Sequence, residues 1–443
     1  MKAIIMAGGE GTRLRPVSHG CPKPMTRLLG RPIMEHIVNL LRRHGFSDIC
    51  VTLCSQPNAI RDYFGNGSAF GVNICYREET EPLGTAGGIK NCVDFIEMDD
   101  VLIISGDAAC DFDLTALWQN HHGSRSVVTI ALAENPDPLR YGLVLTDKLG
   151  QVVSFIEKPD WSRVVTDLVN TGIYVVSPLI LDLISDGERY DFAQDLFPKM
   201  MALGIPIRGS IMSGYWCDVG NPAEYLRCSV DALRGKLRLE DNSAYVSPGV
   251  RCGSRLPKNV KLHTPCLVPE GVVIGEGAEI GPDTVISPGS IVGREAQIRA
   301  SVVDGAEIGA NCVIEGSIVC RGAIVKPGEI LKPGSIIGAP GAEKAPKRAS
   351  LAVRQGECGR AIGEIPCYNR ARMMRHMSEV LMEAGADFSD GLIIERRGGK
   401  VRLSPASNRD AIVIESLGKH APDSSLAEEC TQLANNLSLD DMV

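Results

Sequence analysis

The chain has 443 residues, a net charge of -8 and a hydrophobic fraction of 44%, values typical of an ordinary globular protein with two or three domains. The negative charge argues against nucleic acid or a membrane surface as a partner. No apolar run reaches the roughly 18 residues needed to cross a bilayer, and the N-terminus lacks the features of a signal peptide, so we expect a cytoplasmic protein. Fifteen scattered cysteines without a C-x-x-C pair favour free thiols over disulfides or a zinc site.

The first predicted strand, Ala3–Ala7, runs directly into a glycine-rich loop made of Gly8, Gly9, Glu10, Gly11, Thr12 and Arg13. Glycines at a strand end let the backbone approach a ligand, and their N–H groups can then cradle phosphate oxygens. Arg13 and Lys23 add positive charge suited to a polyphosphate. Leu14 replaces the third glycine of G-x-G-x-x-G, and no G-K-[ST] follows. The sequence therefore predicts neither a dinucleotide-binding turn nor a P-loop.

Residues 1 to about 235 alternate apolar strands with helical patterns. Further strands are predicted at Ile49–Leu53 and Val101–Ser105, and one predicted helix carries Ile33, Ile37, Leu40 and Leu41 on a single face. Strands without polar alternation, separated by helices, predict a largely parallel α/β sheet covered on both faces. Ligands of such sheets bind beyond the carboxyl ends of the strands, which is where the glycine-rich loop lies.

Two aspartates occupy positions suited to a metal-dependent phosphoryl transfer. Asp107 follows the strand Val101–Ser105, and Asp218 lies in the glycine-flanked segment 214–220. Carboxylates from separate strand ends can share one Mg²⁺, which also binds phosphate oxygens. A loop aspartate on its own is usually a solvated turn residue, so the metal interpretation depends on the upstream glycine-rich loop.

Further motifs follow along the same segment. Residues 79–88 (ETEPLGTAGG) predict a second glycine-rich turn, which contains Gly84. Then come Gly142, the pair Glu157-Lys158 at the end of a strand, and Asn170-Thr171-Gly172 at the start of another. An acid–base pair at a strand end can bind sugar hydroxyls and a phosphate, whereas the alternative for Lys158 is an ordinary surface lysine.

The middle of the chain changes to a period of six. Aliphatic residues recur at Val250, Leu256, Leu262, Val268, Ile274, Ile280, Ile286, Val292 and Ile298, and after a slip at Ile308, Ile314, Val325, Leu331 and Ile337. Such hexapeptide repeats predict a parallel β-helix with each aliphatic residue pointing inward. We expect it to act as a spacer and to support a homo-oligomer. A second active site, as in acyltransferases with this repeat, is less favoured because no histidine follows His263 within the coils.

After a predicted linker at residues 340–350, a small α+β unit is expected. Its predicted elements are a helix at Tyr368–Met382, with Met373, Met377, Val380 and Leu381 on one face, strands at Gly391–Glu395, Lys400–Leu403 and Ala411–Ser416, and a last helix near Ser424–Leu437.

Taken in order, the motifs of residues 1–235 resemble the sugar-1-phosphate nucleotidyltransferase family, most closely its mannose-1-phosphate guanylyltransferase branch. The resemblance implies a Rossmann-like (GT-A-like) mixed sheet over 1–235, followed by a left-handed parallel β-helix over 240–340. It implies an NTP, with GTP favoured, and a hexose-1-phosphate as the substrates, and Mg²⁺ as the cofactor.

The resemblance also implies roles for the matching residues. The NTP would be bound by Gly8, Gly9, Gly11, Thr12 and Gly84, the sugar phosphate by Gly142, Glu157, Lys158 and Asn170, and Mg²⁺ by Asp107 and Asp218. Arg13 and Lys23 would join the two aspartates as catalytic residues. Many relatives have alanine where this chain has Thr171, which leaves the identity of the hexose open.

Three readings of the activity follow. The first is the joining of mannose-1-phosphate to GTP, which gives GDP-mannose and pyrophosphate. The second keeps the reaction but uses glucose-1-phosphate with UTP, dTTP or ATP. The third is a non-catalytic homologue that senses a nucleotide sugar and regulates a partner. That third reading predicts decay at Arg13, Lys23, Asp107 or Asp218, and all four are intact.

Residues 350–437 resemble the last domain of phosphohexomutases, in Glu364-Ile365-Pro366-Cys367 and in a degenerate phosphate loop at 402–410. The phosphoserine loop and the aspartate-rich metal loop of those enzymes do not occur in the sequence, so mutase activity is not predicted. A domain kept for packing or assembly is favoured. The alternative is an effector site for a phosphosugar, formed by Arg402, Ser404, Ser407, Asn408 and Arg409.

Overall fold

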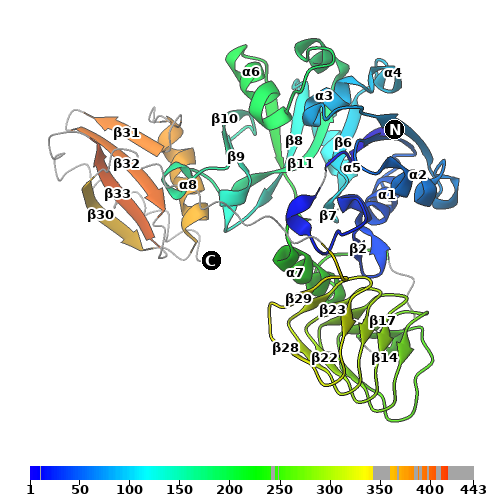
Figure 1. The fold of residues 1–443 in the computed structure, drawn as a ribbon. Coiled ribbons are helices and arrows are strands. Elements are labelled where there is room, and N and C mark those ends of the chain that lie inside the picture. The colour runs from blue at the N-terminus through cyan, green and yellow to red at the C-terminus, as the bar shows by residue number, and fades with distance from the viewer. Residues whose placement is uncertain are drawn as a thin grey trace. The chain divides into compact units, whose positions relative to one another are not determined.

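The computed structural model describes residues 1–9, 11–240, 245–247, 249–342, 360–366, 369–383, 388, 392–396, 399–405 and 411–417. The chain forms two compact units (Figure 1). The first consists of Met1–Pro82, Ile104–Leu114 and Gly214–Ala349, and the second of Leu83–Ile103, Thr115–Ser213 and Ser350–Val443. Among the helices of these described ranges, none combines the length and the hydropathy that a membrane crossing requires.

The first unit begins with three parallel strands, β1 (Lys2–Met6), β4 (Asp48–Leu53) and β5 (Asn73–Glu78). Helices α1 (Ile33–Arg43) and α2 (Pro57–Phe64) connect them. Ala3, Ile4 and Ile5 of β1 are fully buried, and the residues on the predicted face of α1 are buried as well. The parallel pairing expected for this part of the sheet is therefore confirmed.

A second small sheet of the first unit joins two segments that are far apart in the sequence. Strand β6 (Val101–Ser105) ends in a turn that leads into β7 (Ala108–Cys110). Strand β7 pairs antiparallel with β13 (Trp216–Asp218), and Asp218 lies opposite Ala108. Helix α7 (Pro222–Leu233) follows, and the side chain of Asn221 caps its N-terminus by accepting a bond from the Glu224 N–H at 3.0 Å.

The rest of the first unit is the predicted parallel β-helix, whose coils are stacked along one axis beside α7 (Figure 1). One ladder contains β15 (Val250–Cys252), β17 (Cys266–Val268), β20 (Thr284–Ile286), β23 (Val302–Val303), β26 (Ile318–Val319) and β29 (Ile336–Ile337), with β14 (Tyr245–Ser247) antiparallel at its edge. The second contains β16 (Lys261–Leu262), β19 (Glu279–Ile280), β22 (Gln297–Arg299), β25 (Val313–Glu315) and β28 (Ile330–Leu331). The third contains β18 (Val273–Ile274), β21 (Ile291–Val292), β24 (Glu307–Ile308) and β27 (Ile324–Val325).

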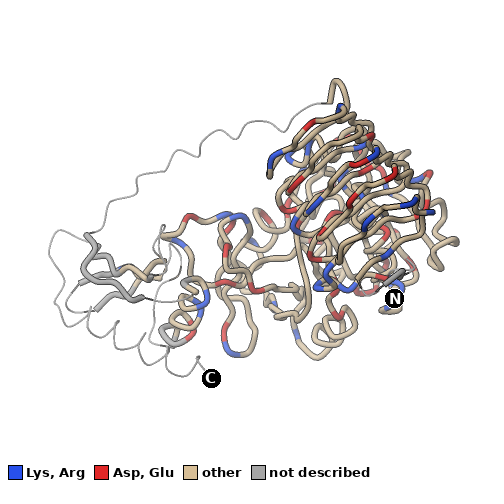
Figure 2. The backbone as a smooth tube through the Cα atoms, turned by 90° about the horizontal axis from the view of Figure 1, so that it is seen from below, with Lys and Arg blue, Asp and Glu red and all other residues tan. Residues whose placement is uncertain are grey.

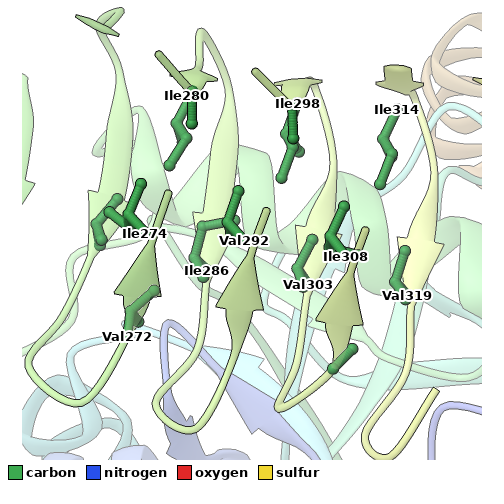
Figure 3. Packing of buried hydrophobic residues seen from close by; sticks show 14 of the residues in the cluster. Val272, Ile274, Ile280, Ile286, Val292, Ile298, Val303, Ile308, Ile314 and Val319 are labelled. Atoms are coloured by element: carbon green, nitrogen blue, oxygen red, sulfur yellow. The ribbon is translucent and has the colours of Figure 1, made fainter. Parts of the chain in front are cut away.

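The core of the β-helix consists of aliphatic rows, one residue per coil. Ile280, Ile298 and Ile314 form one such row in Figure 3, and each pairs with the next in register. Ten of the predicted inward positions are buried, namely Val250, Val268, Ile274, Ile280, Ile286, Val292, Ile298, Ile308, Ile314 and Val325, and Leu256, Leu262, Leu331 and Ile337 are partly buried against them. Val303 and Val319 fill the same core at the points where the six-residue period slips. The structure therefore confirms the β-helix and explains the slip.

Charged residues of both signs are interspersed along the coils of the β-helix (Figure 2). Neighbouring coils are linked by ion pairs such as Lys261 to Glu279, whose Nζ and Oε1 are 2.6 Å apart. Such exposed pairs add little to stability, so the aliphatic rows carry most of the folding energy of this segment.

The second unit contains strands β8 (Val128–Glu134), β9 (Gly142–Thr146), β10 (Val152–Glu157), β11 (Leu168–Val176) and β12 (Ile207–Ile211). Strand β8 pairs antiparallel with β11, and β9 with β10 and β11, whereas β12 is parallel to β8. The expectation of a largely parallel sheet is wrong here, because β9 and β10 form a hairpin whose short connection allows only antiparallel pairing. The mixed sheet implied by the resemblance is confirmed.

Helices of the second unit are α3 (Gly84–Lys90), α4 (Val93–Ile96), α5 (Leu114–His122, starting at the boundary) and α6 (Phe197–Ala202). Its C-terminal part has the antiparallel order β30 (Arg360–Pro366), β33 (Ala411–Leu417), β32 (Gly399–Pro405) and β31 (Leu392–Arg396), with helix α8 (Arg370–Glu383). The predicted helix and its three following strands are confirmed, and β30 was not predicted. The predicted linker from residue 343 onward, the last helix and the loop residues Ser407, Asn408 and Arg409 lie outside the described residues.

Candidate functional site

The first unit brings three of the predicted catalytic side chains into direct contact. The ammonium of Lys23 lies 2.6 Å from Oδ2 of Asp107 and 3.0 Å from Oδ1 of Asp218. Lys23 is only 6% exposed, which is unusual for a lysine and requires compensation by opposite charge. The two carboxylates provide that compensation, so the three groups form one charge cluster.

Local backbone structure sets the two aspartates side by side. Gly106 turns the chain after β6 and donates its N–H to the carbonyl of Met6 at 2.8 Å. A Cβ on Gly106 would lie 3.0 Å from that carbonyl oxygen, so the close approach favours glycine. The hydroxyl of Ser105 donates to Oδ1 of Asp107 at 2.6 Å. Pairing of β7 with β13 then places Asp218 opposite Ala108, next to Asp107 in the sequence.

The three charged groups of the cluster shift one another's pKa values. Burial lowers the pKa of Lys23, but Asp107 and Asp218 outweigh this effect and raise the pKa well above its usual value. Burial is the largest influence on Asp107 and raises its pKa, but the charge and hydrogen bond of Lys23, together with the hydrogen bond from Ser105, lower the pKa overall. For Asp218, burial and the neighbouring Asp107 together outweigh Lys23, so its pKa is raised. At neutral pH Lys23 is therefore firmly protonated.

The glycine-rich loop lies against this cluster through Gly11. Gly11 has a φ of +62°, in the left-handed region, and begins the short 3-10 helix Thr12–Leu14. A Cβ on Gly11 would lie 2.6 Å from the Cβ of Lys23. Gly9, by contrast, has no atom within 4 Å of such a Cβ. Arg13 is exposed at the surface of the loop.

The donor set of the cluster fits a hard divalent cation. Asp107 and Asp218 direct carboxylate oxygens toward one point, at which a cationic group, the ammonium of Lys23, already lies. Carboxylate oxygen is the ligand that Mg²⁺ prefers, and one or two carboxylates plus substrate phosphates normally complete its shell. Among the residues described, no group of three or more His, Cys, Asp or Glu side chains could hold a metal. Two carboxylates therefore fit Mg²⁺ bound together with a phosphate ligand better than a site made of protein alone.

In the second unit, three of the predicted sugar-phosphate residues lie together. Gly142 begins β9 and pairs with Glu157 at the end of β10. A Cβ on Gly142 would lie 2.8 Å from Oε2 of Glu157 and 2.8 Å from the ring of Phe155. The ammonium of Lys158 is 3.3 Å from Oε1 of Glu157, and Lys158 has a φ of +44°. The glycine thus leaves room for the glutamate side chain to cross over β9.

Asn170 lies on the neighbouring strand β11, where Val169 pairs with Leu143 of β9. Its amide nitrogen donates to the hydroxyl of Tyr174 at 3.0 Å, and its amide oxygen accepts the Gly172 N–H at 3.1 Å. Burial raises the pKa of Tyr174, so its hydroxyl stays protonated. The regular pairing of β11 with β8 is interrupted between Asn170 and Tyr174. Asn170 is therefore held by side-chain bonds where the ladder is irregular.

The predicted glycine-rich turn at residues 79–88 is correct only for the irregular residues 79–83, because Gly84 begins helix α3. A Cβ on Gly84 would lie 2.6 Å from the carbonyl oxygen of Tyr190, and Gly84 has a φ of +75°. That carbonyl accepts the N–H groups of Ala86 and Gly87 at 2.9 and 3.0 Å. The glycine is needed here for packing within the second unit, in addition to any contact with a nucleoside.

Sequence reasoning missed two side chains that orient site residues. Ser105 fixes Asp107, and its position directly before the Gly-Asp pair at a strand end was a usable signal. Tyr174 anchors Asn170, but residues four apart in a regular strand lie about 13 Å apart on one face, too far for a side-chain hydrogen bond. The strand irregularity that brings them together has no clear signature in the sequence.

Comparison with known proteins gives a consistent result. A domain-family profile described as nucleotidyl transferase matches residues 2–235, and one described as GMPPB C-terminal domain matches residues 262–342. A UTP–glucose-1-phosphate uridylyltransferase from Synechocystis is 37% identical over 277 residues, which cover 58% of this chain and 70% of that protein. A mannose-1-phosphate guanylyltransferase from Mycobacterium tuberculosis is 35% identical over 234 residues, which cover 53% and 65% of the two chains.

Among solved structures, HddC from Yersinia pseudotuberculosis complexed with GMP-PN matches with 28% identity and a TM-score of 0.45, covering 52% of this chain and 97% of that one. The family assignment itself depends on the sequence comparisons, in which the first profile extends over more than half of the residues. The chain belongs to the nucleotidyl transferase family.

Proposed function

We propose that the chain transfers a nucleoside monophosphate from an NTP to a hexose-1-phosphate and releases pyrophosphate and a nucleotide sugar. The observation that carries the proposal is the buried ammonium of Lys23, held between Asp107 and Asp218 and packed against the glycine-rich loop. A fixed positive charge, two carboxylates and a close-approach loop are the parts that transfer to a phosphate requires.

The chemistry needs little from the protein beyond position and charge. A phosphate oxygen of the hexose-1-phosphate attacks the α-phosphorus of the NTP in line, the new P–O bond forms, and pyrophosphate leaves with the electrons of the broken bond. The attacking phosphate is anionic at pH 7, so no general base is required. Asp107 and Asp218 would hold Mg²⁺, which supplies charge neutralisation of the phosphates when bound.

The protein groups of the first unit would bind the nucleotide. Lys23 is protonated at neutral pH because the two aspartates raise its pKa, so it can neutralise the reacting phosphates. Gly8, Gly9, Gly11 and Thr12 would bring backbone N–H groups toward the phosphates. Arg13, which is exposed on the same loop, would add a second cation.

In the second unit, Gly142, Glu157, Lys158 and Asn170 would bind the sugar phosphate. Glu157 offers carboxylate oxygens for sugar hydroxyls, and Lys158 places an ammonium beside them for the phosphate. Gly84 would contact the nucleoside. These assignments come from the resemblance, and the proximity of Gly142, Glu157 and Lys158 supports them.

Mannose-1-phosphate and GTP are the proposed substrates, with GDP-mannose as the product. Support comes from the GMPPB C-terminal profile and from relatives named mannose-1-phosphate guanylyltransferase in Mycobacterium tuberculosis and in rice, the latter 30% identical over 75% of its length. A second pair, glucose-1-phosphate with UTP, is favoured by the uridylyltransferase from Synechocystis. We further propose a cytoplasmic homo-oligomer. The exposed Val273 and Ile324 on one ladder of the β-helix support self-association.

The test is pyrophosphate release with Mg²⁺ across five NTPs and a set of hexose-1-phosphates that includes mannose-1-phosphate and glucose-1-phosphate. Asp107→Asn and Asp218→Asn are assayed beside the wild type. Asp113→Asn is the matched control. Asp113 lies in the same segment of the first unit as Asp107, but its side chain is largely exposed and pairs with His44. Release with one NTP–sugar pair, lowered by roughly 10²–10³ in either site variant and unchanged in the control, is expected.

Other outcomes discriminate among the alternatives. Release with UTP and glucose-1-phosphate alone would replace the guanylyl assignment and keep the reaction. Absence of release with every pair, in protein that still binds a nucleotide sugar, would overturn the enzyme and favour the regulatory homologue.

A further inference from the structure

Helix α8 of the C-terminal part is bound to the segment that leads into strand β11, within the second unit. The hydroxyl of Ser378 donates to the carbonyl of Val165 at 2.8 Å, and Ser378 is fully buried. One turn earlier, Arg375 is only 5% exposed. A buried arginine is almost always paired with opposite charge. The partners of Arg375 therefore show which residues helix α8 contacts.

The guanidinium of Arg375 is surrounded by three carboxylates. Its Nη2 lies 2.9 Å from Oε1 of Glu134, and its Nε lies 3.3 Å from Oδ1 of Asp167 and 4.0 Å from Oε1 of Glu379. Asp167 is 2% exposed, and burial raises the pKa of its carboxyl although Arg375 acts in the opposite direction. The charge of Asp167 therefore depends on Arg375.

Glu134 and Asp167 belong to the paired ends of two strands. Glu134 is the last residue of β8, and it lies opposite Leu168, the first residue of β11. The carbonyl of Asp167 also accepts the N–H of Asn135 at 2.8 Å. One side chain of the C-terminal helix thus binds both strands at the point where their pairing begins.

Asp167 directly precedes strand β11, and Asn170 is three residues further along the chain, within the strand. The pairing of β11 with β8 is regular from Leu168 to Asn170 and is interrupted between Asn170 and Tyr174. On its C-terminal side Asn170 thus has no regular ladder to fix its place. Its position follows from the anchored Asp167 and Leu168 on the N-terminal side. On the C-terminal side it follows from the side-chain bonds with Tyr174 and Gly172 and from the Thr171 hydroxyl, which donates to the carbonyl of Ala131 at 2.7 Å.

We propose that Arg375 is a positioning residue for the hexose-phosphate site, acting through Glu134 and Asp167 on the position of Asn170. The inference rests on the proposed function, in which Asn170 binds the sugar phosphate. It gives the C-terminal domain a specific task in substrate binding, beyond packing. Loss of Arg375 leaves Asp167 buried without its counter-charge, so the start of β11 shifts toward water.

The test uses the full chain with Arg375→Gln, and Arg372→Gln as the matched control. Arg372 lies on the same helix, is exposed, and acts on Asp167 only as a weaker, more distant charge. Both variants therefore remove one positive charge, but only Arg375→Gln removes the direct ion pairs with Glu134 and Asp167. With the NTP–sugar pair that the wild type uses, Arg375→Gln is expected to raise KM for the hexose-1-phosphate by about tenfold or more, since small misplacements can cost up to ~10². KM for the NTP is expected to stay within about twofold of the wild type.

Amide hydrogen exchange of peptides covering residues 164–172 is the second readout, and it needs no turnover. Faster exchange in Arg375→Gln than in Arg372→Gln is expected. If Arg375→Gln does not fold, Ser378→Ala takes its place, with faster exchange and a KM increase of about threefold for one lost hydrogen bond.

Equal exchange and equal KM in the site and control variants would overturn the inference, and so would an Arg375→Gln effect of the same size on both substrates. An inactive wild type would count against the proposed function alone, because the exchange measurement would still show whether Arg375 holds β11.

Discussion

Gly11 and Lys23 are packed so closely that a Cβ built on the glycine would lie 2.6 Å from the Cβ of the lysine. Real Cβ contacts do not reach such a distance, so either the loop or the lysine would have to move. The ammonium of Lys23 is itself fixed between Asp107 and Asp218. The position of the glycine-rich loop is therefore coupled to that of the charge cluster. A displacement of the loop backbone would also displace the ammonium of Lys23.

Gly11→Ala is expected to impair both stability and turnover. The positive φ of Gly11 costs a residue with a side chain about 1–3 kcal/mol, and the clash with Lys23 adds to that cost. Urea unfolding measures the stability change, and Gly9→Ala is its control because a Cβ there meets nothing within 4 Å. An equal loss of stability in the two variants would contradict the packing argument. Turnover is expected to fall at least tenfold, because Lys23 is displaced.

Lys23→Met is expected to change how stability depends on pH. In the wild type the pKa of Lys23 is raised, so its contribution is present below pH 10.5 and is lost as the pH rises through the folded-state value. The lowered pKa of Asp107 contributes stability above pH 3.8, which is lost as the pH falls. Without the ammonium, burial and mutual repulsion raise both carboxyl pKa values above their unfolded values. The variant then loses stability as the pH rises.

Urea unfolding at pH 5 and pH 8 measures this effect. Lys23→Met is expected to be destabilised on the order of 3 kcal/mol at pH 8 and by less at pH 5, since breaking a buried pair leaves uncompensated charge. Lys258→Met is the control, because Lys258 is exposed in the same unit. A deficit independent of pH would show that Lys23 acts through packing and not as the counter-ion of the two carboxylates.

Ile298→Ala is expected to destabilise the β-helix by about 2–5 kcal/mol, because Ile298 is fully buried in a row between Ile280 and Ile314. Ile330→Ala is the matched control, since Ile330 is 71% exposed on the same ladder, and its effect is expected to stay within about 0.5 kcal/mol. Far-ultraviolet circular dichroism followed during urea unfolding provides the comparison. Similar effects in the two variants would mean that the aliphatic rows do not carry the stability of the coils.

The β-helix was predictable because every inward position repeats the same physical requirement. An aliphatic residue must fill the core once per flat face, and this requirement gives the period of six. Val303 and Val319 escaped prediction because each follows the preceding inward residue, Ile298 or Ile314, after five residues and not six, although they still pair with each other across coils. Parallel strand pairing is kept when the turn between two faces is one residue shorter. A search for a strict period of six, however, misses the inward residue that follows such a turn.

The charge cluster was only partly predictable. The sequence analysis predicted that Asp107 lies at a strand end and acts together with Asp218. In the structure the two aspartates come together because β7 pairs with β13. The insertion of Lys23 between them, 195 residues before Asp218, depends on tertiary structure that local patterns do not encode. Helix α3 was missed for a similar reason, since glycines have low helix propensity and the carbonyl of Tyr190 that satisfies its first turn is distant in sequence.

Tyr174→Phe tests the anchoring of Asn170 in the proposed sugar-phosphate site. The substitution removes the hydroxyl that accepts the Asn170 amide at 3.0 Å, while the bond from Gly172 N–H to the amide oxygen remains. The ring contacts with Phe192 and Phe197, at centroid distances of 4.8 and 5.4 Å, are also retained. The loss of one hydrogen bond is expected to lower the unfolding free energy by about 1 kcal/mol. Because Asn170 is then held less firmly, KM for the hexose-1-phosphate is expected to rise roughly fivefold.

Tyr76→Phe is the matched control for Tyr174→Phe. It removes a hydroxyl that donates to the carbonyl of Gly65 at 2.6 Å in the first unit. Steady-state kinetics with each substrate varied in turn distinguish the two sites, and the control is expected to leave KM for the sugar phosphate unchanged. If Tyr174→Phe instead altered KM for the NTP and left that of the sugar phosphate as it was, Asn170 would belong to the nucleotide and its assignment to the sugar would be wrong.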